Sequence, residues 1–312
     1  MGCGMRYQEI GTSGVNASRV AMGVWFASKG KTQKELERAL DTSLELGINF
    51  IDTAYIYGDG QSSTGLGLAL KHVGADRSKL YLQTKIGIRH DPKRYDLSYE
   101  HVIDAVDTEL ERLQTDYLDF VLIHRYDPLC DVDALSAAFN ELHRSGKVRH
   151  FGVSNMGPWM VEMLQGGLDE RLEVDQLEFG LGHTGPLSAQ AHVNLDDDVA
   201  IDRDGGVIPY CQCRHMTIQA WSPFKRDMRG GSIFDADALP ELNAKLDELA
   251  SSYGTSKEAI ACAWILRHPA GIQVLSGSSN PEHIRNVAAG ADIDLSRVDW
   301  YGLYVAAGND IP

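Results

Sequence analysis

The sequence predicts a (β/α)8 barrel, the TIM-barrel fold, preceded by an N-terminal β-hairpin. Short apolar stretches typical of strands alternate eight times with longer amphipathic stretches typical of helices along the 312 residues. Such alternation implies parallel strands joined by right-handed crossovers. A length above about 250 residues, with no linker, favours one closed barrel. An open, doubly wound sheet is the alternative. We expect residues 1–312 to form a single domain.

The expected strands are short and evenly distributed along the chain. They are residues 20–22, 49–51, 80–84, 119–123, 150–153, 174–177, 217–220 and 273–275. The hairpin is expected in residues 6–10 and 15–19, on either side of a turn with two glycines.

Helices are expected between the strands because apolar residues there recur every three or four positions. Helix starts are indicated by two capping boxes and an Asn-Pro pair: Thr32 with Glu35, Thr255 with Glu258, and Asn280 before Pro281. Gly146 is expected to end a helix in the left-handed conformation. The connections 178–216 and 222–255 are long, which is typical of functional loops.

The composition excludes several classes of protein. There are 29 Lys and Arg against 44 Asp and Glu, a formal charge of −15, which argues against nucleic acid or an anionic membrane as a partner. Five cysteines (Cys3, Cys130, Cys211, Cys213 and Cys262) are too few and too scattered for a disulfide scaffold. No apolar run approaches the roughly 18 residues of a membrane span. A soluble cytoplasmic protein is therefore expected.

A metal site is not expected. Cys211, Cys213 and His215 lie close together in the sequence, but their spacing matches no common zinc pattern. We expect this segment to belong to a helix face or to the core.

Polar residues follow three consecutive expected strands. Asp52 ends the second strand, Lys85 the third and His124 the fourth, and Tyr57 lies in the loop beyond the second. Because the carboxyl ends of barrel strands form the active-site face, these four side chains should converge. Each of them alone is more often structural: a cap, a rim ion pair or a core histidine. Four together at this face favour a catalytic site.

These residue types suit proton donation to a carbonyl oxygen. A tyrosine has a pKa near 10, and a neighbouring Lys ammonium lowers that pKa by stabilising the tyrosinate. A carboxylate beside the lysine would hold it charged, and a histidine could orient the substrate oxygen.

Four motifs in order along the chain resemble those of the aldo-keto reductases. They are Phe50-Ile-Asp-Thr-Ala-Tyr-Ile-Tyr-Gly58, Gln83-Thr-Lys85, Leu122-Ile-His-Arg125 and Gly152-Val-Ser-Asn155. The segments 122–128 and 300–312 are most similar to the bacterial general oxidoreductases of that superfamily.

The resemblance implies a catalytic tetrad of Asp52, Tyr57, Lys85 and His124, with Tyr57 as the general acid. It also implies a nicotinamide cofactor extended across the barrel mouth. The positions that match its binding site are Gly23, Val24, Ser154, Asn155, Gln176, Trp221, Ser222, Pro223, Phe224, Lys225, Arg226, Ser276, Gly277, Ser278, His283 and Asn286. Among them Trp221 would stack on the nicotinamide. Trp25, Tyr55 and Trp159 are expected as pocket aromatics, although all three could instead be packing residues.

The chain departs from the family pattern at two places. Many members carry Lys at position 277 and Arg at position 283, where this chain has Gly277 and His283, so NAD(H) stays possible. NADP(H) is still favoured, because Ser278, His283, Lys225 and Asn286 could recognise the additional phosphate. Many relatives also have an acidic residue where Ser63 stands. We expect Ser62 or Ser63 to cap the following helix instead.

The leading hypothesis is reduction of a small-molecule aldehyde or ketone by hydride transfer. One alternative is a cofactor-binding sensor or regulatory subunit with little turnover. Another is an enzyme that uses Lys85 as a Schiff-base nucleophile. Neither the physiological substrate nor the oligomeric state is indicated by the sequence.

Overall fold

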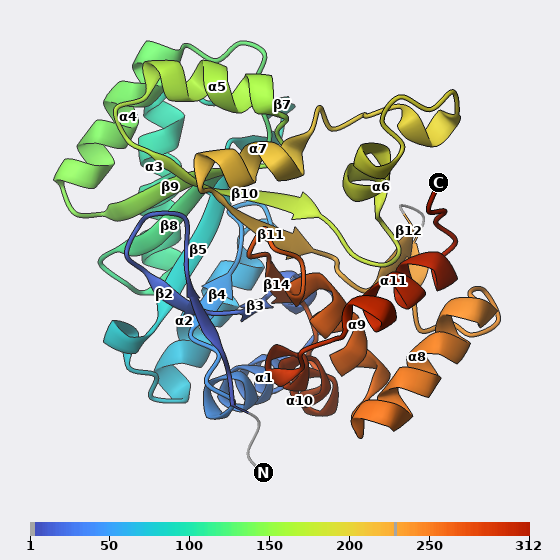
Figure 1. The fold of residues 1–312 in the computed structure, drawn as a ribbon. Helices are drawn as coiled ribbons and strands as arrows, with labels where there is room; N and C mark the ends of the chain where they lie inside the picture. Colours follow the sequence, from blue (N-terminus) through green and yellow to red (C-terminus); the bar gives the residue numbers. More distant parts are fainter. Residues whose placement is uncertain (1–3, 228–229) are drawn as a thin grey trace.

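The computed structural model describes residues 4–227 and 230–312, and Cys3 lies outside this part. Eight parallel strands close into a barrel in the order in which they occur along the chain (Figure 1). They are β3 (Val20–Gly23), β4 (Phe50–Asp52), β5 (Tyr81–Ile86), β8 (Leu118–Ile123), β9 (Val148–Ser154), β10 (Leu172–Glu178), β11 (Thr217–Trp221) and β14 (Gln273–Ser276). All eight expected strands are confirmed, and the open sheet is excluded.

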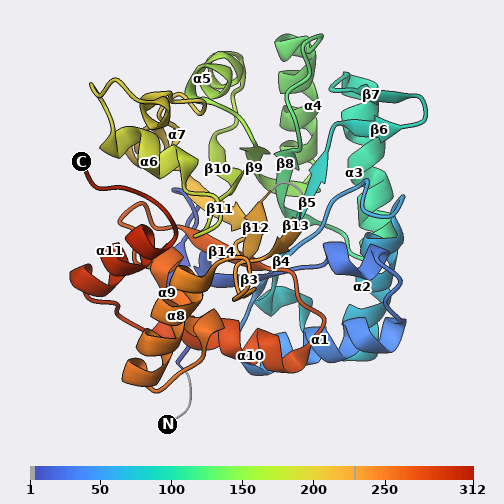
Figure 2. The same cartoon turned by 90° about the vertical axis from the view of Figure 1, so that its right-hand side faces the viewer.

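A ring of helices surrounds the barrel (Figure 2). Its members are α1 (Gln33–Glu45), α2 (Gln61–His72), α3 (Tyr99–Leu113), α4 (Val132–Arg144), α5 (Pro158–Gly167), α7 (Val207–Arg214), α9 (Lys257–Leu266) and α10 (Pro281–Ala289). The segment from Cys211 to His215 lies on α7 and the residue after it, and Cys211 is buried. Among the described residues, no group of three or more His, Cys, Asp or Glu side chains is placed to hold a metal ion.

Further elements decorate the barrel. The additional helices are α6 (Gly185–Ala191), α8 (Pro240–Tyr253) and α11 (Arg297–Ala306), with short 3-10 turns η1 (Trp25–Ser28), η2 (Arg77–Lys79), η3 (Asp198–Ala200) and η4 (Gly290–Asp292). The additional strands are the paired β1 (Tyr7–Glu9) and β2 (Asn16–Ser18), β6 (Ile88–His90) and β7 (Lys93–Tyr95), and β12 (Lys225–Asp227) and β13 (Gly230–Ser232). The long connections 178–216 and 222–255 therefore contain ordered elements, although we expected loops. No helix in the described part of the chain is long and apolar enough to cross a membrane.

The expected helix boundaries are mostly confirmed. Thr32 and Glu35 form the predicted reciprocal capping box, and Asn280 caps α10. Gly146 follows α4 with φ +76°. The capping box at Thr255 is wrong: α9 begins one residue later, and the side chain of Ser256 accepts the hydrogen bond from the N–H of Ala259.

The prediction that Ser62 or Ser63 caps α2 is also wrong. The helix begins after Gly60, so both serines lie inside its first turn and are fully buried. Ser63 donates instead to the carboxylate of Glu109 on α3, at 2.8 Å. The hydroxyl is therefore recruited by a neighbouring helix rather than by a free backbone N–H.

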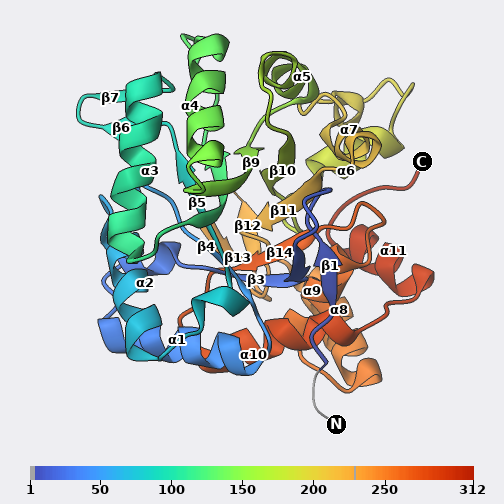
Figure 3. The same cartoon turned by 90° about the vertical axis from the view of Figure 1, so that its left-hand side faces the viewer.

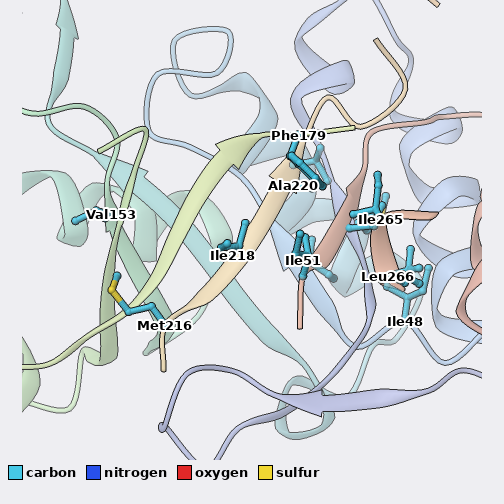
Figure 4. Packing of buried hydrophobic residues seen from close by; sticks show 14 of the residues in the cluster. Ile48, Ile51, Val153, Phe179, Met216, Ile218, Ala220, Ile265 and Leu266 are labelled. Carbon is cyan, nitrogen blue, oxygen red and sulfur yellow. The ribbon is translucent and has the colours of Figure 1, made fainter. Parts of the chain in front are cut away.

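The outer faces of the strands pack against the helices. Ile51 of β4, Ile218 and Ala220 of β11 and Ile265 of α9 belong to this apolar layer (Figure 4). Since successive strand residues point to opposite sides, the intervening positions face the barrel axis. The interior of the barrel is accordingly a separate environment from the outer layer.

The hairpin β1–β2 lies against the N-terminal end of the barrel (Figure 3). Its apolar residues join an interior cluster formed by Ile10, Val15, Ala17, Ala21, Phe50, Phe120, Leu122, Val174 and Leu275. The N–H of Gly11 donates to Thr217 at 2.7 Å, and the N–H of Thr12 donates to Glu173 at 2.6 Å. This end of the barrel is thus closed, which leaves the carboxyl end of the strands as the open face.

Candidate active site

Asp52 and Lys85 form a buried ion pair at the carboxyl ends of β4 and β5. The Lys85 Nζ lies 2.6 Å from both carboxylate oxygens of Asp52 and 2.6 Å from the carbonyl oxygen of Thr53. Lys85 is only 1% exposed. Burial lowers the pKa of Lys85, but Asp52 and then Tyr57 outweigh that effect, and the net pKa is raised. The lysine therefore stays charged beneath the barrel mouth.

Tyr57 lies directly above this pair. The Lys85 Nζ is 5.1 Å from the centre of the Tyr57 ring. Burial raises the pKa of Tyr57 more than the Lys85 charge lowers it. The sequence-based expectation of a lowered pKa is therefore wrong for the net effect, because burial, together with the Asp52 charge, outweighs the effect of Lys85. A tyrosine with a raised pKa is fully protonated at neutral pH, which is the state that a proton donor needs.

His124 completes the group from the end of β8. Its ring meets that of Tyr57 edge to face, with centroids 5.9 Å apart and an interplanar angle of 78°. Burial, followed by the charges of Lys85 and Arg125, lowers the pKa of His124 well below its usual value. Its buried Nδ1 has no hydrogen-bond partner among the described residues. The imidazole is therefore neutral and retains unused hydrogen-bonding capacity.

A chain of glutamine side chains supports the pair from below, and sequence reasoning missed it. Gln83 and Gln176 both donate to Asp52 Oδ1, at 2.7 and 3.0 Å. Both also donate to Gln219, at 2.7 and 3.1 Å, and Gln219 donates to Gln273 at 2.9 Å. These amides satisfy the buried carboxylate and fix its orientation. The available signal was one Gln within each of four expected strands, where a polar residue interrupts an apolar stretch.

A second buried network holds the loop that carries Tyr57. The Glu109 carboxylate on α3 accepts from Ser63 at 2.8 Å and from Thr84 at 2.6 Å, and it pairs with Arg112 at 3.1 Å. Arg112 in turn donates to the carbonyl oxygen of Tyr55 at 3.0 Å. The loop is thereby tied to α2, α3 and β5.

Three residues that the resemblance assigns to the nicotinamide lie together on the mouth. Ser154 Oγ donates to the carbonyl oxygen of Gln176 at 2.9 Å, and Asn155 Nδ2 donates to Ser154 Oγ at 2.7 Å. Trp221 Nε1 donates to Asn155 Oδ1 at 3.0 Å. The backbone of Asn155 has φ +57°, so the turn presents its amide group in an unusual, defined direction. The Gln176 amide lies deeper, bonded to Asp52 and Gln219.

The segment 222–226 lies beyond Trp221 and packs on a glycine turn. A Cβ at Gly180 would lie 2.2 Å from the carbonyl oxygen of Pro223, and one at Gly182 would lie 2.2 Å from that of Lys225. The Lys225 Nζ lies 3.6 Å from Glu178 Oε1. The Arg226 Nε forms an ion pair with Asp227 Oδ2 at 3.1 Å. Phe224 contacts Phe234.

The segment 276–286 runs from the end of β14 into α10. Ser276 is buried and Gly277 is exposed. Ser278 Oγ accepts a hydrogen bond from the N–H of Asn280 at 3.1 Å, and Asn280 caps α10. Ser278 therefore lies at the N-terminus of this helix, and the exposed His283 lies in its first turn. Asn286 donates to Glu258 at 3.4 Å. A helix N-terminus of this kind attracts phosphate groups.

The loop after β3 lies beside the tetrad. Gly23 pairs with Asp52 across the sheet, and the N–H of Val24 donates to the carbonyl oxygen of Asp52 at 3.0 Å. Trp25 is half exposed, with Lys29 4.3 Å above its ring. Tyr55 packs against His101 and Arg112 of α3. The structure therefore places Trp25 at the mouth but holds Tyr55 against α3.

A cavity of about 480 Å³ opens next to Asn155 and Trp221. It lies between the loops that follow β8, β9 and β10 and the segment that leads into α7. Trp159 lines it, whereas Trp25 and Tyr55 do not. Its ionisable lining residues are Arg125, Glu178, His183, Arg203 and Asp204.

A model of the aldo/keto reductase family matches residues 19–301 of this sequence. The chain belongs to that family. The family resemblance read from the four motifs is thereby confirmed.

Curated relatives of this aldo/keto reductase cover almost its whole length. It is 33% identical to a 6-dehydroglucose reductase of Agrobacterium fabrum, over 93% of this chain and 94% of the relative. It is 32% identical to Oxidoreductase YdhF of Escherichia coli, over 97% and 98%. An aldo/keto reductase from Klebsiella pneumoniae, solved in complex with NADP and acetate, has the same fold, with a TM-score of 0.77 at 23% identity and coverage of 98% and 96%. The chain is thus an oxidoreductase of known fold.

One further residue of this aldo/keto reductase was not found from the sequence. Asp175 on β10 points away from the barrel axis and is fully buried, and neither carboxyl oxygen has a hydrogen-bond partner among the described residues. Burial raises the pKa of Asp175 to about 8. The N–H groups of Asn155 and Met156 oppose that effect, because they lie near the carboxyl group although outside hydrogen-bond geometry. Asp175 is therefore a mostly neutral acid directly beneath the Ser154–Asn155 turn. A single buried acid leaves no periodic signal in the sequence.

Proposed function

We propose that the protein reduces aldehydes or ketones to alcohols with NADPH, and that Tyr57 donates the proton to the carbonyl oxygen. The observation that carries this proposal is a series of contacts at the barrel mouth. Asp52 binds the ammonium of Lys85, and that ammonium lies under the ring of Tyr57. The ring of His124 contacts the Tyr57 ring edge to face. This set places one protonated phenol, one fixed cation and one neutral imidazole at the open end of the barrel.

Each of the four residues has a separate task. Tyr57 transfers its proton as negative charge develops on the substrate oxygen, and the resulting tyrosinate is stabilised by the ammonium of Lys85. Asp52 keeps Lys85 charged and in place through contacts of 2.6 Å. His124, being neutral, hydrogen-bonds the same oxygen and orients the carbonyl group.

The bound nicotinamide would supply the hydride to the carbonyl carbon. Ser154 and Asn155 would hold its carboxamide, with Gln176 nearby and the Trp221 ring beside it. Gly23 and Val24 would line the mouth on the side of β3. The polar turn at Asn155 fits this role because Trp221 fixes the direction of its amide.

The phosphate groups would lie along the rest of the mouth. Segment 222–226 supplies the cations Lys225 and Arg226 for the pyrophosphate. The adenosine end would be held by residues 276–286, with Ser278 at the N-terminus of α10 and His283 in its first turn. The N-terminus of α10 favours a bound phosphate group, and this supports NADPH as the preferred cofactor.

The test is the loss of nicotinamide absorbance with aromatic aldehydes, quinones and ketosteroids, measured with NADPH and NADH in parallel. We expect turnover with NADPH, and we expect Tyr57→Phe to reduce kcat by about 10²–10⁴-fold, because it removes the general acid. Cofactor affinity, measured by calorimetry, should be unchanged in this variant. Equal activity of Tyr57→Phe and the parent would contradict the role of Tyr57, and tight NADPH binding without turnover on any carbonyl would contradict the reductase.

A further inference from the structure

Two guanidinium groups line the cavity beside the active site without a partner. Arg125 follows His124 directly, and Arg203 lies in the segment that leads into α7. Within residues 4–227 and 230–312, neither side chain forms a hydrogen bond or an ion pair. In a chain with a formal charge of −15, carboxylates to pair with them are abundant.

The acids near these arginines are engaged elsewhere. Asp127, two residues after Arg125, accepts from the N–H groups of Leu97 at 3.1 Å and Leu129 at 2.9 Å. Asp202, next to Arg203, accepts from the N–H of Asp204 at 2.9 Å.

The two acids that line the cavity do not cancel its positive charge. Glu178 lies 3.6 Å from Lys225, which offsets its charge. Asp204 is partly buried, and that burial raises its pKa. The neighbouring charge of Asp202 adds to this effect, while His183 and Arg203 oppose it. Lys225 compensates the charge of Glu178. If Asp204 is fully ionised, it cancels one of the two guanidinium charges, so the cavity retains one positive charge.

Arg125 connects the cavity with the catalytic group, because it lines the cavity and directly follows His124 in the chain. Its charge lowers the pKa of both Tyr57 and His124, so the guanidinium lies within electrostatic reach of the reacting oxygen. An anion bound at Arg125 would therefore lie near the catalytic group.

An aromatic side chain forms part of the cavity wall. Trp159, at the start of α5, is 85% exposed. A large apolar ring that is so exposed beside a cavity offers a flat surface to a ligand body. Trp221 lines the same cavity and joins it to the Asn155 turn.

We propose that this cavity is an anion subsite, in which Arg125 and Arg203 bind a carboxylate or phosphate remote from the carbonyl group of the substrate. The preferred substrates are thus oxyanion-bearing aldehydes or ketones. This inference rests on the proposed reductase activity. A guanidinium suits it because its planar donors match carboxylate and phosphate oxygens.

The experiment compares substrates that differ only in charge. One arm uses 4-carboxybenzaldehyde and its neutral counterpart methyl 4-formylbenzoate, and the other uses glyceraldehyde 3-phosphate and glyceraldehyde. We expect kcat/KM to favour the anion about tenfold in at least one arm, mainly through KM, and to fall toward parity as salt screens the charges. The arm with the larger ratio identifies a carboxylate or a phosphate as the preferred anion.

Variants of the two arginines test the assignment. Arg203→Gln should lower the anion-to-neutral ratio severalfold, and Arg125→Gln/Arg203→Gln should abolish it. Arg144→Gln is the matched control, because this exposed arginine lies in the last turn of α4, at the opposite end of the barrel, and should leave the ratio unchanged. A wild-type ratio of one or below in both arms, or a ratio insensitive to Arg203→Gln, would overturn the subsite.

A binding measurement separates the subsite from the reductase activity. If no aldehyde in either arm consumes NADPH, the proposed function fails, and calorimetry with 4-carboxybenzaldehyde and methyl 4-formylbenzoate then decides the subsite. Tighter binding of 4-carboxybenzaldehyde that is lost in Arg203→Gln supports the anion subsite. Equal affinities for the two compounds overturn it.

Discussion

At the N-terminal end of the barrel, the hairpin β1–β2 covers the strands and pairs their polar groups, whereas at the carboxyl end several polar groups are left free. Ser18 exchanges hydrogen bonds with Asn49 at 2.8 and 3.1 Å, and its carbonyl oxygen accepts from Gln273 at 2.7 Å. At the other end, His124 Nδ1 lacks a partner in the described part of the chain. The guanidinium of Arg125 is likewise unpaired there.

The same strands therefore serve two purposes. A satisfied polar group contributes to stability, while an unsatisfied one retains its capacity to bind a ligand. Changes at the closed end should affect folding, and changes at the open end should affect chemistry. Three substitutions test this difference, beginning with the largest expected effect on kcat.

The largest effect is expected at the open end from Lys85→Met. This change removes the cation that stabilises the tyrosinate, so kcat should fall by about 10²–10⁴-fold. It also leaves Asp52 buried without its partner, which should destabilise the protein by about 3–5 kcal/mol. Steady-state kinetics and urea unfolding measure the two effects.

The matched control is Asp52→Asn/Lys85→Met, which removes both charges. The double variant should regain much of the lost stability but none of the lost activity. Recovery of activity together with stability would show that Lys85 acts only through folding.

A second effect is expected at the closed end from Phe120→Ala. Phe120 is fully buried against Phe50, with ring centroids 5.5 Å apart. Its truncation should cost about 3–5 kcal/mol in the free energy of unfolding. The kcat per folded molecule should stay near that of the parent. A large loss of kcat without a loss of stability would contradict the division between the two ends.

The third substitution is Asp175→Asn, beneath the Asn155 turn, and its effect is on the pH dependence of stability. Because the pKa of Asp175 is raised to about 8 in the folded protein, the folded state holds a proton that the unfolded chain has released. Stability from this group is present at acidic pH and is lost as the pH rises toward 8, by roughly 1.4 kcal/mol per pH unit.

Asparagine lacks this ionisation, so the variant should gain stability relative to the parent as the pH rises. Urea midpoints between pH 5 and pH 9 measure the difference, since the other titrating groups are common to both proteins. Parallel curves for the two proteins would refute the buried ionisation.

Much of the fold could be predicted from local patterns. The alternation of strands and helices and the caps at Thr32 and Asn280 depend on residues close in sequence, and all were confirmed. The convergence of Asp52, Tyr57, Lys85 and His124 was also predictable, because parallel strands bring their carboxyl ends to one face.

Tertiary contacts decided the rest. Ser63 reads locally as a cap, but Glu109, 46 residues away, binds its hydroxyl. The net pKa of Tyr57 depends on burial, which outweighs its neighbour Lys85. The glutamine chain joins residues from separate strands, and the cavity of Arg125 and Arg203 joins residues from separate loops. The burial of Asp175 likewise depends on segments that are distant in the sequence. Local periodicity sets which face of an element is apolar, but only the packed barrel determines which polar groups find partners and which stay free.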